Sequence, residues 1–163
     1  MLQKWIYLLV VFFLVFQGHA LADSGTEGVL QKLREDCQTL LIETYKNENS
    51  FVRAAVLRAA GESHDIKLIP LLTKGLEDYY PTARLFALQG LKNISRTAVL
   101  TAARKLTNDT DIWVRSAAVE ILGDEGGPEV AEEIRGYLKS YDVPMKLAAS
   151  AGLVKLGKKN YMK

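Results

Sequence analysis

A repeat with a fixed period constrains this chain more than any other feature of its sequence. The clearest copy reads Phe-Val-Arg-Ala-Ala-Val-Leu-Arg-Ala-Ala-Gly and begins at Phe51. The basic residue of the copy recurs every 31 residues, at Arg53, Arg84, Arg115 and Lys146. A sequence that repeats itself at an interval of this length is typical of proteins built from stacked structural units.

The apolar positions of each copy fall into two groups separated by polar residues, which predicts two helices per repeat. The second group contains columns such as Val52, Ala83, Val114 and Met145, and its apolar positions share one face of a helix. The first group contains columns such as Leu41, Leu72, Ala103 and Ile134. Neither helix can bury its apolar face alone, so the copies must stack. The sequence therefore predicts an all-α solenoid of about four two-helix repeats.

Turn residues divide the repeats into expected helices. Asn49 and Ser50 suit a helix start, Pro81 suits a first helical position, and Pro70 is tolerated only in a first turn. A helix containing Pro70 is therefore expected to begin nearer Leu68 than Ile66. We expect helices over residues 29–45, 51–62, 66–76, 82–92, 97–106, 112–122, from 128 or 129 onward, and 143–156.

The N-terminus has the pattern of a secretory signal peptide. Lys4 precedes an apolar run from Trp5 to Phe16, and Ala20 and Ala22 occupy the positions that a signal peptidase reads. The alternative is an uncleaved membrane anchor, but the run is shorter than the ~20 residues that a span needs. We expect a signal peptide over residues 1–22, a flexible leader over 23–27, a repeat domain over 28–157 and a basic tail over 158–163. The protein is then exported, to a periplasm or out of the cell.

Charge and cysteine content limit the partners and crosslinks. The formal net charge is only +2, which argues against nucleic acid as a partner, because such binding needs a basic face. The C-terminal lysines are expected to be a solvated helix end, the alternative being a membrane-surface patch; they are Lys155, Lys158, Lys159 and Lys163. The single cysteine, Cys37, excludes an intramolecular disulfide and is expected to be buried with Leu68, Val99 and Val130. A reactive thiol or an intermolecular crosslink is the alternative.

The third copy resembles a known family. Asp111, Val114-Arg115, Ala118 and Leu122-Gly123 are similar to the HEAT-like repeats of the phycobilisome-lyase type. The resemblance covers about residues 28–157 and implies a right-handed α-solenoid whose second helices line a concave face. It also implies that the Asp and Arg of the motif bridge neighbouring repeats. Because Asn49 and Tyr80 replace the Asp in the first two copies, only Asp111 and Asp142 are expected to bridge, and the arginines are expected to be structural.

No arrangement of residues indicates catalysis, and neither a metal nor a cofactor is expected. Ser63, His64 and Asp65 are adjacent, whereas a catalytic triad converges from separate segments, so they are expected to form a turn. The chain lacks a Cys/His cluster of the kind that binds zinc. The glycines between 123 and 127 lack the spacing of a phosphate-binding loop. The protein is therefore expected not to be an enzyme.

The residues most suited to binding a partner are aromatic side chains near the turns and two columns on the second helices. The columns expected to face the concave side are Ala54, Leu85, Ser116 and Leu147, and Arg58, Gln89, Glu120 and Ala151. Aromatic residues and arginine are frequent interface anchors. The alternative is that the aromatic residues cap the hydrophobic seams between repeats. The predicted partner-binding residues are Phe51, Arg58, Tyr79, Tyr80, Leu85, Gln89, Trp113, Glu120 and Tyr141.

Three functional hypotheses follow. The first is an exported scaffold that binds a protein or peptide on its concave face or its aromatic edge. The second, taken from the resemblance, is a pigment-lyase-like subunit or isomerase factor that acts with a partner. The third is a self-assembling structural subunit. It would form a homo-oligomer through the C-terminal helix, where Leu147, Ala151 and Val154 lack the polar cap that repeat arrays need.

Overall fold

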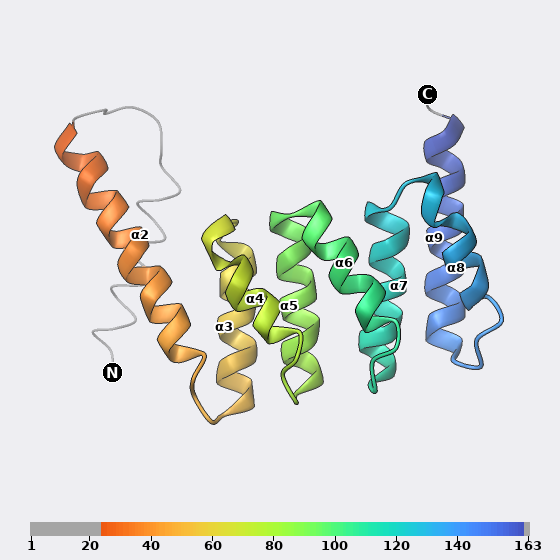
Figure 1. Cartoon of the computed structure of the whole chain (residues 1–163), viewed down its shortest axis with the longest axis horizontal. Coiled ribbons are helices and arrows are strands. Elements are labelled where there is room, and N and C mark those ends of the chain that lie inside the picture. The colour runs from red at the N-terminus through yellow and green to blue at the C-terminus, as the bar shows by residue number, and fades with distance from the viewer. Residues whose placement is uncertain (1–23, 162–163) are drawn as a thin grey trace. The chain divides into compact units, whose positions relative to one another are not determined.

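The computed structural model describes residues 24–161, and this range contains helices and turns with no strand (Figure 1). The predicted signal peptide lies outside the described residues. The chain divides into two compact units, residues 1–37 and residues 38–163. The elements are α2 (Ser24–Thr44), α3 (Ser50–Glu62), η1 (Ile66–Leu68), α4 (Ile69–Gly75), α5 (Pro81–Ile94), α6 (Arg96–Leu106), α7 (Ile112–Glu125), η2 (Pro128–Val130), α8 (Ala131–Tyr137) and α9 (Val143–Tyr161).

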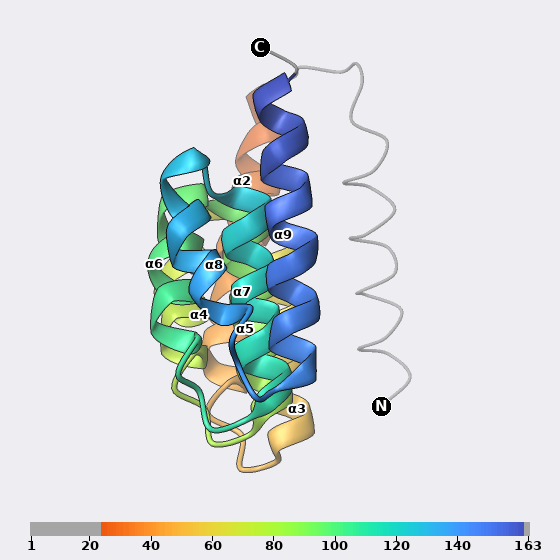
Figure 2. The same ribbon diagram turned by 90° about the vertical axis from the view of Figure 1, so that its right-hand side faces the viewer.

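The second unit is built from two layers of helices. Helices α3, α5, α7 and α9 stand side by side in one layer, and α4, α6 and α8 form the other layer (Figures 1 and 2). The short helices η1 and η2 lead into α4 and α8. Each member of the first layer is thus the second helix of a repeat, as the period predicts. The prediction of an all-α solenoid is confirmed.

Side chains in the turns start the helices where the sequence predicts. The Asn49 side chain accepts a hydrogen bond from the Phe51 N–H at 2.9 Å and so caps α3. Tyr80 makes no side-chain cap, and α5 instead begins at Pro81. Pro70 lies in the first turn of α4, where its missing N–H would have no helical partner. This explains why the α-helix begins at Ile69 and the residues before it form a 3-10 turn.

The core lies between the two layers and follows the repeat. Leu72 of α4, Ala103 of α6 and Ile134 of α8 form one column of the period, and all three are fully buried. Leu57 of α3 and Leu88 of α5 are also fully buried and belong to the same core cluster. A single continuous apolar seam therefore joins the repeats, because each repeat buries its apolar side chains against its neighbours.

Glycine pairs set how closely neighbouring second helices approach. A Cβ added to Gly61 of α3 would lie 2.3 Å from the Cα of Gly90 in α5. A Cβ on Gly123 of α7 would lie 2.4 Å from the Cα of Gly152 in α9. The corresponding positions between α5 and α7 are Lys92 and Ile121, one period away. The backbones of α3 and α5, and of α7 and α9, therefore touch directly, whereas larger side chains occupy the boundary between α5 and α7.

A single methyl group at this contact is expected to destabilise the protein. Gly123→Ala forces α7 and α9 apart, and we expect it to cost about 1–3 kcal/mol, the usual effect of overpacking. The matched control is Gly157→Ala in α9, where no atom lies within 4 Å of the added Cβ. That change is expected to stabilise the helix by up to about 1 kcal/mol. Urea unfolding of both variants measures the difference, and a stabilising Gly123→Ala would contradict the direct backbone contact.

The ends of the helical region differ from the prediction. Residues 24–27, expected as part of a flexible leader, form the first turn of α2, where the negative charge of Glu27 favours a helix N-terminus. At the other end, α9 continues through Lys158 and Lys159 to Tyr161 instead of ending at Leu156. Lysine is a good helix former and its charge favours a helix C-terminus. Asp23 and residues 162–163 lie outside the described range.

The prediction that Cys37 is buried is wrong. Its thiol is exposed, whereas Leu68, Val99 and Val130 at the equivalent positions are buried. The prediction assumes that α2 packs as the first helices of the later repeats do. Cys37 belongs to the first compact unit, however, whereas the three residues at equivalent positions belong to the second.

Candidate partner-binding edge

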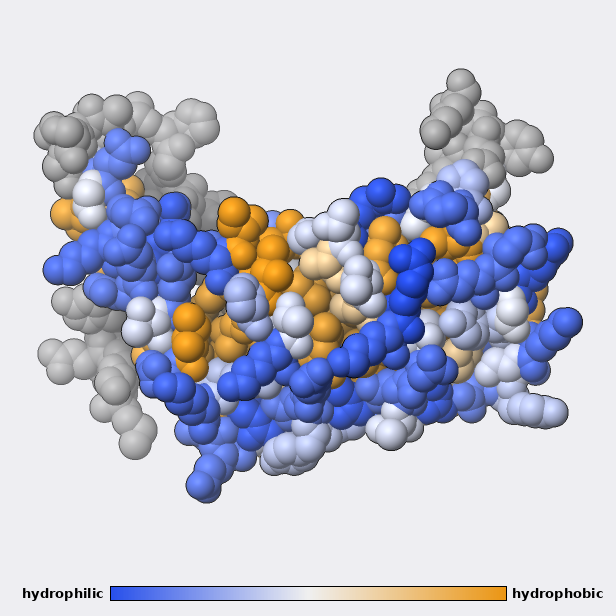
Figure 3. All heavy atoms as spheres, viewed as in Figure 1, coloured by the Kyte–Doolittle hydropathy of each residue, from blue (hydrophilic) through white to orange (hydrophobic). Residues whose placement is uncertain are grey.

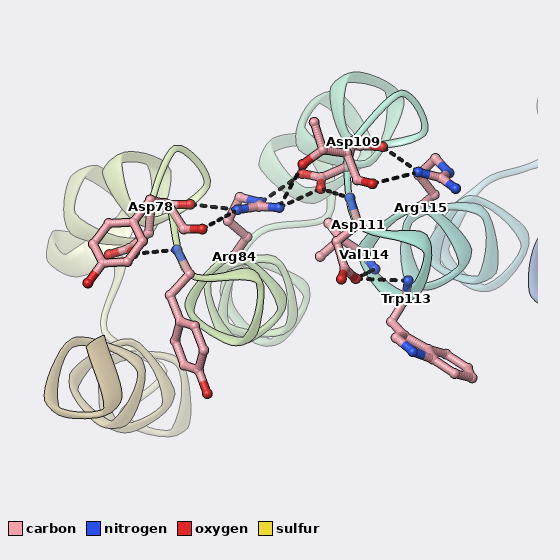
Figure 4. Close-up of polar contacts among 10 residues, drawn as sticks. Asp78, Arg84, Asp109, Asp111, Trp113, Val114 and Arg115 are labelled. Carbon is pink, nitrogen blue, oxygen red and sulfur yellow. Dashed lines mark hydrogen bonds and ion pairs between the residues drawn. The ribbon is translucent and has the colours of Figure 1, made fainter. Parts of the chain in front are cut away.

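Three arginine–aspartate pairs run along the turns that precede the second helices. Arg53 binds Asp78 through two hydrogen bonds of 2.6 and 2.9 Å. Arg84 binds Asp109 in the same way, at 2.8 and 2.6 Å (Figure 4). Arg115 reaches a single oxygen of Asp142 through two nitrogens, at 2.6 and 3.2 Å. The three pairs form a continuous ladder from α3 to the turn before α9.

Each arginine also binds the turn that precedes its own helix. The Nη1 of Arg84 donates to the carbonyl oxygens of Asp78 and Tyr79, at 2.7 and 3.2 Å. Arg115 makes the equivalent bonds to the carbonyls of Asp109 and Thr110, and Arg53 to those of Asn47 and Glu48. Every arginine therefore ties its own turn to the aspartate of the next turn, which fixes the spacing of these turns.

The ladder corrects the expectation taken from the resemblance. Asp111 does not bridge repeats but caps α7, accepting from the N–H groups of Trp113 and Val114 at 2.9 and 3.1 Å (Figure 4). The bridging partners are Asp78 and Asp109, which precede Tyr80 and Asp111 of the expected column by two residues. The ladder is therefore not interrupted at the first two copies. Asp142 bridges as expected. Ser140 occupies the column of Asp78 and Asp109 in the last repeat, which leaves Asp142 to reach Arg115.

The first pair, Arg53 and Asp78, is buried and shares a hydrogen-bonded group with the buried Tyr45. Asp78 also accepts a hydrogen bond from the Tyr45 hydroxyl at 3.1 Å. Burial alone would raise the pKa of Asp78, but the hydrogen bonds from Arg53 and the Tyr80 N–H hold that pKa below its ordinary value of 3.8. Burial, together with the charge of Asp78, raises the pKa of Tyr45 to about 12. The carboxylate is therefore charged and the phenol is neutral at physiological pH.

Four of the five predicted aromatic residues are exposed next to this ladder. The exposed fractions are 69% for Phe51, 74% for Tyr79 and 63% for Trp113, and Tyr141 is fully exposed. Tyr80 differs, because it is half-buried and packs against the core. We call these five residues the aromatic edge. Phe51 and Trp113 are the second residues of α3 and α7, and the tyrosines lie in the turns before α5 and α9.

Contacts within the aromatic edge hold part of it in place. The ring of Phe51 meets the ring of Tyr80 edge to face, with 5.3 Å between centroids. The guanidinium of Arg53 lies 4.7 Å from the ring centroid of Tyr79, a cation–π distance. The ladder arginine therefore orders an exposed aromatic side chain as well as the turn.

The remaining predicted site residues lie on the second helices. Arg58, Gln89 and Glu120 are exposed, and the Arg58 guanidinium lies 5.9 Å from the ring centroid of Phe86. Leu85 is half-buried and packs against the core. Its column was expected to face the concave side of the solenoid, and this is wrong for Ala54, which is buried. The reason is that Ala54 lies on the face of α3 that packs against α5.

An apolar groove lies between α4 and α6. Its volume is about 450 Å³, and its walls include Leu76, Leu91 and Ala98. Figure 3 shows apolar surface gathered over this part of the molecule. The two charged residues of the groove, Glu77 and Lys105, pair with each other at 2.8 Å. The lining therefore offers no uncompensated charge that would select a particular ligand.

The residues that could suggest catalysis form a turn. His64 adopts a left-handed backbone conformation with φ 55° between α3 and η1, and its ring contacts the carbonyl of Glu62. Asp65 caps η1 and accepts a hydrogen bond from Gln38 at 2.6 Å.

Among residues 24–161, no three His, Cys, Asp or Glu side chains gather closely enough to hold a metal ion. Within the same range, no helix combines the length and apolar character needed to cross a membrane.

The layered helices and the repeating ladder define an α-solenoid repeat protein. The family model of HEAT repeats matches residues 69–153, more than half of the chain. The chain belongs to the HEAT-repeat family. HEAT repeats commonly mediate protein–protein interaction and scaffolding. No curated protein matches the chain. The more specific resemblance to repeats of the phycobilisome-lyase type stays a prediction.

Proposed function

We propose that this protein is an exported, non-enzymatic HEAT-repeat scaffold that captures a protein or peptide partner on its aromatic edge. One observation carries the proposal, namely that Phe51, Tyr79, Trp113 and Tyr141 expose most of their surface at the turns before successive second helices. Side chains that only capped the seams between repeats would be covered, as Tyr80 is in part. Export rests on the signal-peptide pattern of residues 1–22.

The energetics of such an edge favour binding. Large aromatic side chains bury much apolar area when a partner covers them, and they are frequent hot spots of interfaces. The arginine–aspartate ladder fixes the turns that carry them, so that little backbone entropy is lost on docking. The exposed side chains of Arg58, Gln89 and Glu120 provide polar contacts on the second helices for a partner that extends beyond the edge.

Removing one anchor tests the proposal. The partner is first identified by photo-crosslinking in the native compartment from a reactive amino acid at position 113, with position 66 as the control. We then expect Trp113→Ala to weaken binding of that partner about 30-fold, the effect of a hot spot worth about 2 kcal/mol. Because Trp113 is exposed, the free energy of unfolding should change by less than about 0.5 kcal/mol.

The matched control is Ile66→Ala, which removes an equally exposed apolar side chain from η1. It should leave partner binding unchanged. If Trp113→Ala instead lowers the melting temperature sharply while the folded variant binds normally, Trp113 is a structural residue and the proposal is wrong. Equal crosslinking from positions 66 and 113 would also contradict it.

A further inference from the structure

The exposed residues of the aromatic edge form two similar groups. Phe51 is the second residue of α3, and Tyr79 lies in the turn before α5. Trp113 and Tyr141 lie two periods later, in the equivalent places of α7 and of the turn before α9. We call Phe51 and Tyr79 the first aromatic site, and Trp113 and Tyr141 the second aromatic site. Each site lies at the end of one closely packed helix pair, α3 with α5 or α7 with α9.

The stretch of the edge between the two sites is polar. One period after Phe51 and Tyr79, the corresponding positions hold Thr82 and Thr110. Thr110 is exposed, and its hydroxyl accepts a long hydrogen bond from Arg84 at 3.4 Å. A ligand that covers the whole edge therefore meets two groups of aromatic rings with a polar gap between them.

The charges along the edge largely cancel. Arg53, Arg84 and Arg115 each bind an aspartate of the following turn, with a shortest distance of 2.6 Å between nitrogen and oxygen. Arginine clusters that recognise phosphorylated or acidic peptides need guanidinium groups that the ligand can reach, whereas these are already paired. Glu48 in the first turn and Lys139 in the last are exposed and opposite in charge. The edge therefore favours a ligand without net charge.

Polar side chains beside the rings are bound within their own turns. Asn49 and Asp111 cap α3 and α7, and the Ser140 hydroxyl accepts from the N–H two residues later at 3.1 Å. A sugar chain would need such side chains, because each hydroxyl that it buries requires a hydrogen-bond partner. The edge offers instead ring surface, the indole N–H of Trp113, which extends away from the ladder (Figure 4), and the hydroxyl of the fully exposed Tyr141.

A proline-rich segment complements this surface. Proline has no backbone N–H, so its backbone only accepts hydrogen bonds, and the indole N–H of Trp113 only donates them. The polyproline II helix leaves its carbonyl groups accessible and forms before binding, so that aromatic surfaces capture it at a low cost in entropy. Another common way of binding peptides is to add a strand to a sheet edge, but residues 24–161 contain no strand.

The spacing of the helices sets the length of such a segment. Neighbouring helices pack about 8–10 Å apart, so the edge from α3 past α5 and α7 to α9 spans roughly 30 Å. A polyproline II helix rises about 3.1 Å per residue. About ten residues therefore cover both aromatic sites, and about four cover one of them.

We propose that the aromatic edge binds one extended, uncharged, proline-rich segment of its partner at both aromatic sites at once. This inference rests on the proposed function and adds the chemical class of the ligand and the number of sites that it occupies. Once one site is filled, the second binds a segment that is already held close to it, so the affinity for the long segment exceeds that of either site. The arginine–aspartate ladder fixes the spacing that the segment must match.

Tryptophan fluorescence tests the proposal with synthetic oligoproline. The chain contains two tryptophans, Trp5 of the predicted signal peptide and Trp113. In the exported protein, and equally in the full chain carrying Trp5→Phe, the fluorescence therefore reports on the second aromatic site alone. A fifteen-residue oligoproline, about 45 Å long, covers both sites, and a five-residue one, about 15 Å long, covers one. The long peptide should bind about 100-fold more tightly than the short peptide.

Phe51→Ala separates binding at two sites from a simple effect of peptide length. The short peptide should bind the second site of this variant as before. The long peptide should fall to within about tenfold of the short one, because only its additional binding registers remain. Phe51 is exposed, so the variant should fold, which circular dichroism verifies, and Tyr79→Ala should act in the same way. The control Ile66→Ala should change neither affinity, and a fifteen-residue glycine–serine peptide should leave the fluorescence unchanged.

The proposal is wrong if the long peptide binds the natural protein and Phe51→Ala equally, or if oligoproline leaves the Trp113 fluorescence unchanged. A response to chitohexaose, a neutral sugar chain, without a response to oligoproline would show that the edge binds a glycan, and it overturns the proposal as well. The proposed function fails separately, when no partner crosslinks from position 113. A partner that is captured there although oligoproline does not bind leaves the scaffold function standing and overturns only the proline-rich ligand.

Discussion

Replacing Arg84 with methionine is expected to destabilise the protein by about 3–5 kcal/mol, the usual cost of breaking a buried ion pair by removing one partner. The guanidinium is buried and makes four short bonds, two to the Asp109 carboxylate and two to the carbonyl oxygens of Asp78 and Tyr79. Methionine fills much of the volume but leaves the Asp109 carboxylate, only 6% exposed, without its counterion. Urea unfolding followed by circular dichroism measures the loss.

Two further variants separate the ion pair from the rest of the site. In Arg84→Met/Asp109→Leu the uncompensated charge is gone, and about half of the lost stability should return. Lys105→Met removes a cation of similar length from the exposed pair with Glu77 and should cost less than about 1 kcal/mol. If Arg84→Met costs no more than Lys105→Met, the ladder does not stabilise the stack. The ordering of the aromatic edge would then need another explanation.

The arginine–aspartate ladder also shows which contacts of this chain can be predicted from its sequence and which cannot. The period predicts that Arg53, Arg84 and Arg115 occupy equivalent places, and the structure confirms this. The resemblance predicts that the bridging aspartates lie in the column of Asp111. Asp78 and Asp109 are themselves 31 residues apart, so the period contained the signal. The sequence alone could not tell which of the two acidic columns caps a helix and which bridges repeats, because that depends on the path of the turn.

The sequence predicts which residues form the aromatic edge, but it does not predict which of them are exposed. Position at a turn places Tyr79 and Tyr80 together, yet Tyr79 is exposed and Tyr80 packs against the core. Successive residues of an extended turn point to opposite sides, and only the turn geometry decides which side is covered. The exposure of Cys37 was missed for a different reason. The period treats all repeats as equal, but Cys37 belongs to the first compact unit and its equivalents belong to the second.

Along the row of second helices, two closely packed helix pairs, α3 with α5 and α7 with α9, are separated by a wider boundary between α5 and α7. Gly61 and Gly123 are 62 residues apart, as are Gly90 and Gly152, so the direct backbone contacts recur every second repeat. Phe51 and Trp113 are separated by the same interval, and so are Tyr79 and Tyr141. The structural unit is therefore a pair of repeats. Each pair has one glycine contact and presents its own set of exposed aromatic residues.

This alternation makes the boundary between α5 and α7 the place where the stack should separate. Leu122→Asp puts a carboxylate at a fully buried position of α7, and we expect it to cost more than about 4 kcal/mol, because the charge is removed from water within the apolar core. Repeat arrays can lose one part while neighbouring repeats stay folded, because each repeat contacts only its neighbours. The amides of α6, α7, α8 and α9 should therefore exchange hydrogen rapidly, while those of α3 and α5 stay protected.

Hydrogen exchange followed by mass spectrometry measures this pattern peptide by peptide. The matched control is Leu122→Met, which nearly conserves volume and should cost less than about 1.5 kcal/mol with uniform protection. If Leu122→Asp instead removes protection from α3 and α5 to the same extent, the four repeats unfold as one unit. The glycine-free boundary would then be no weaker than its neighbours. Partial protection confined to α3 and α5 would show that Lys92 and Ile121 divide the stack into two cooperative pairs, each held together by its own glycine contact.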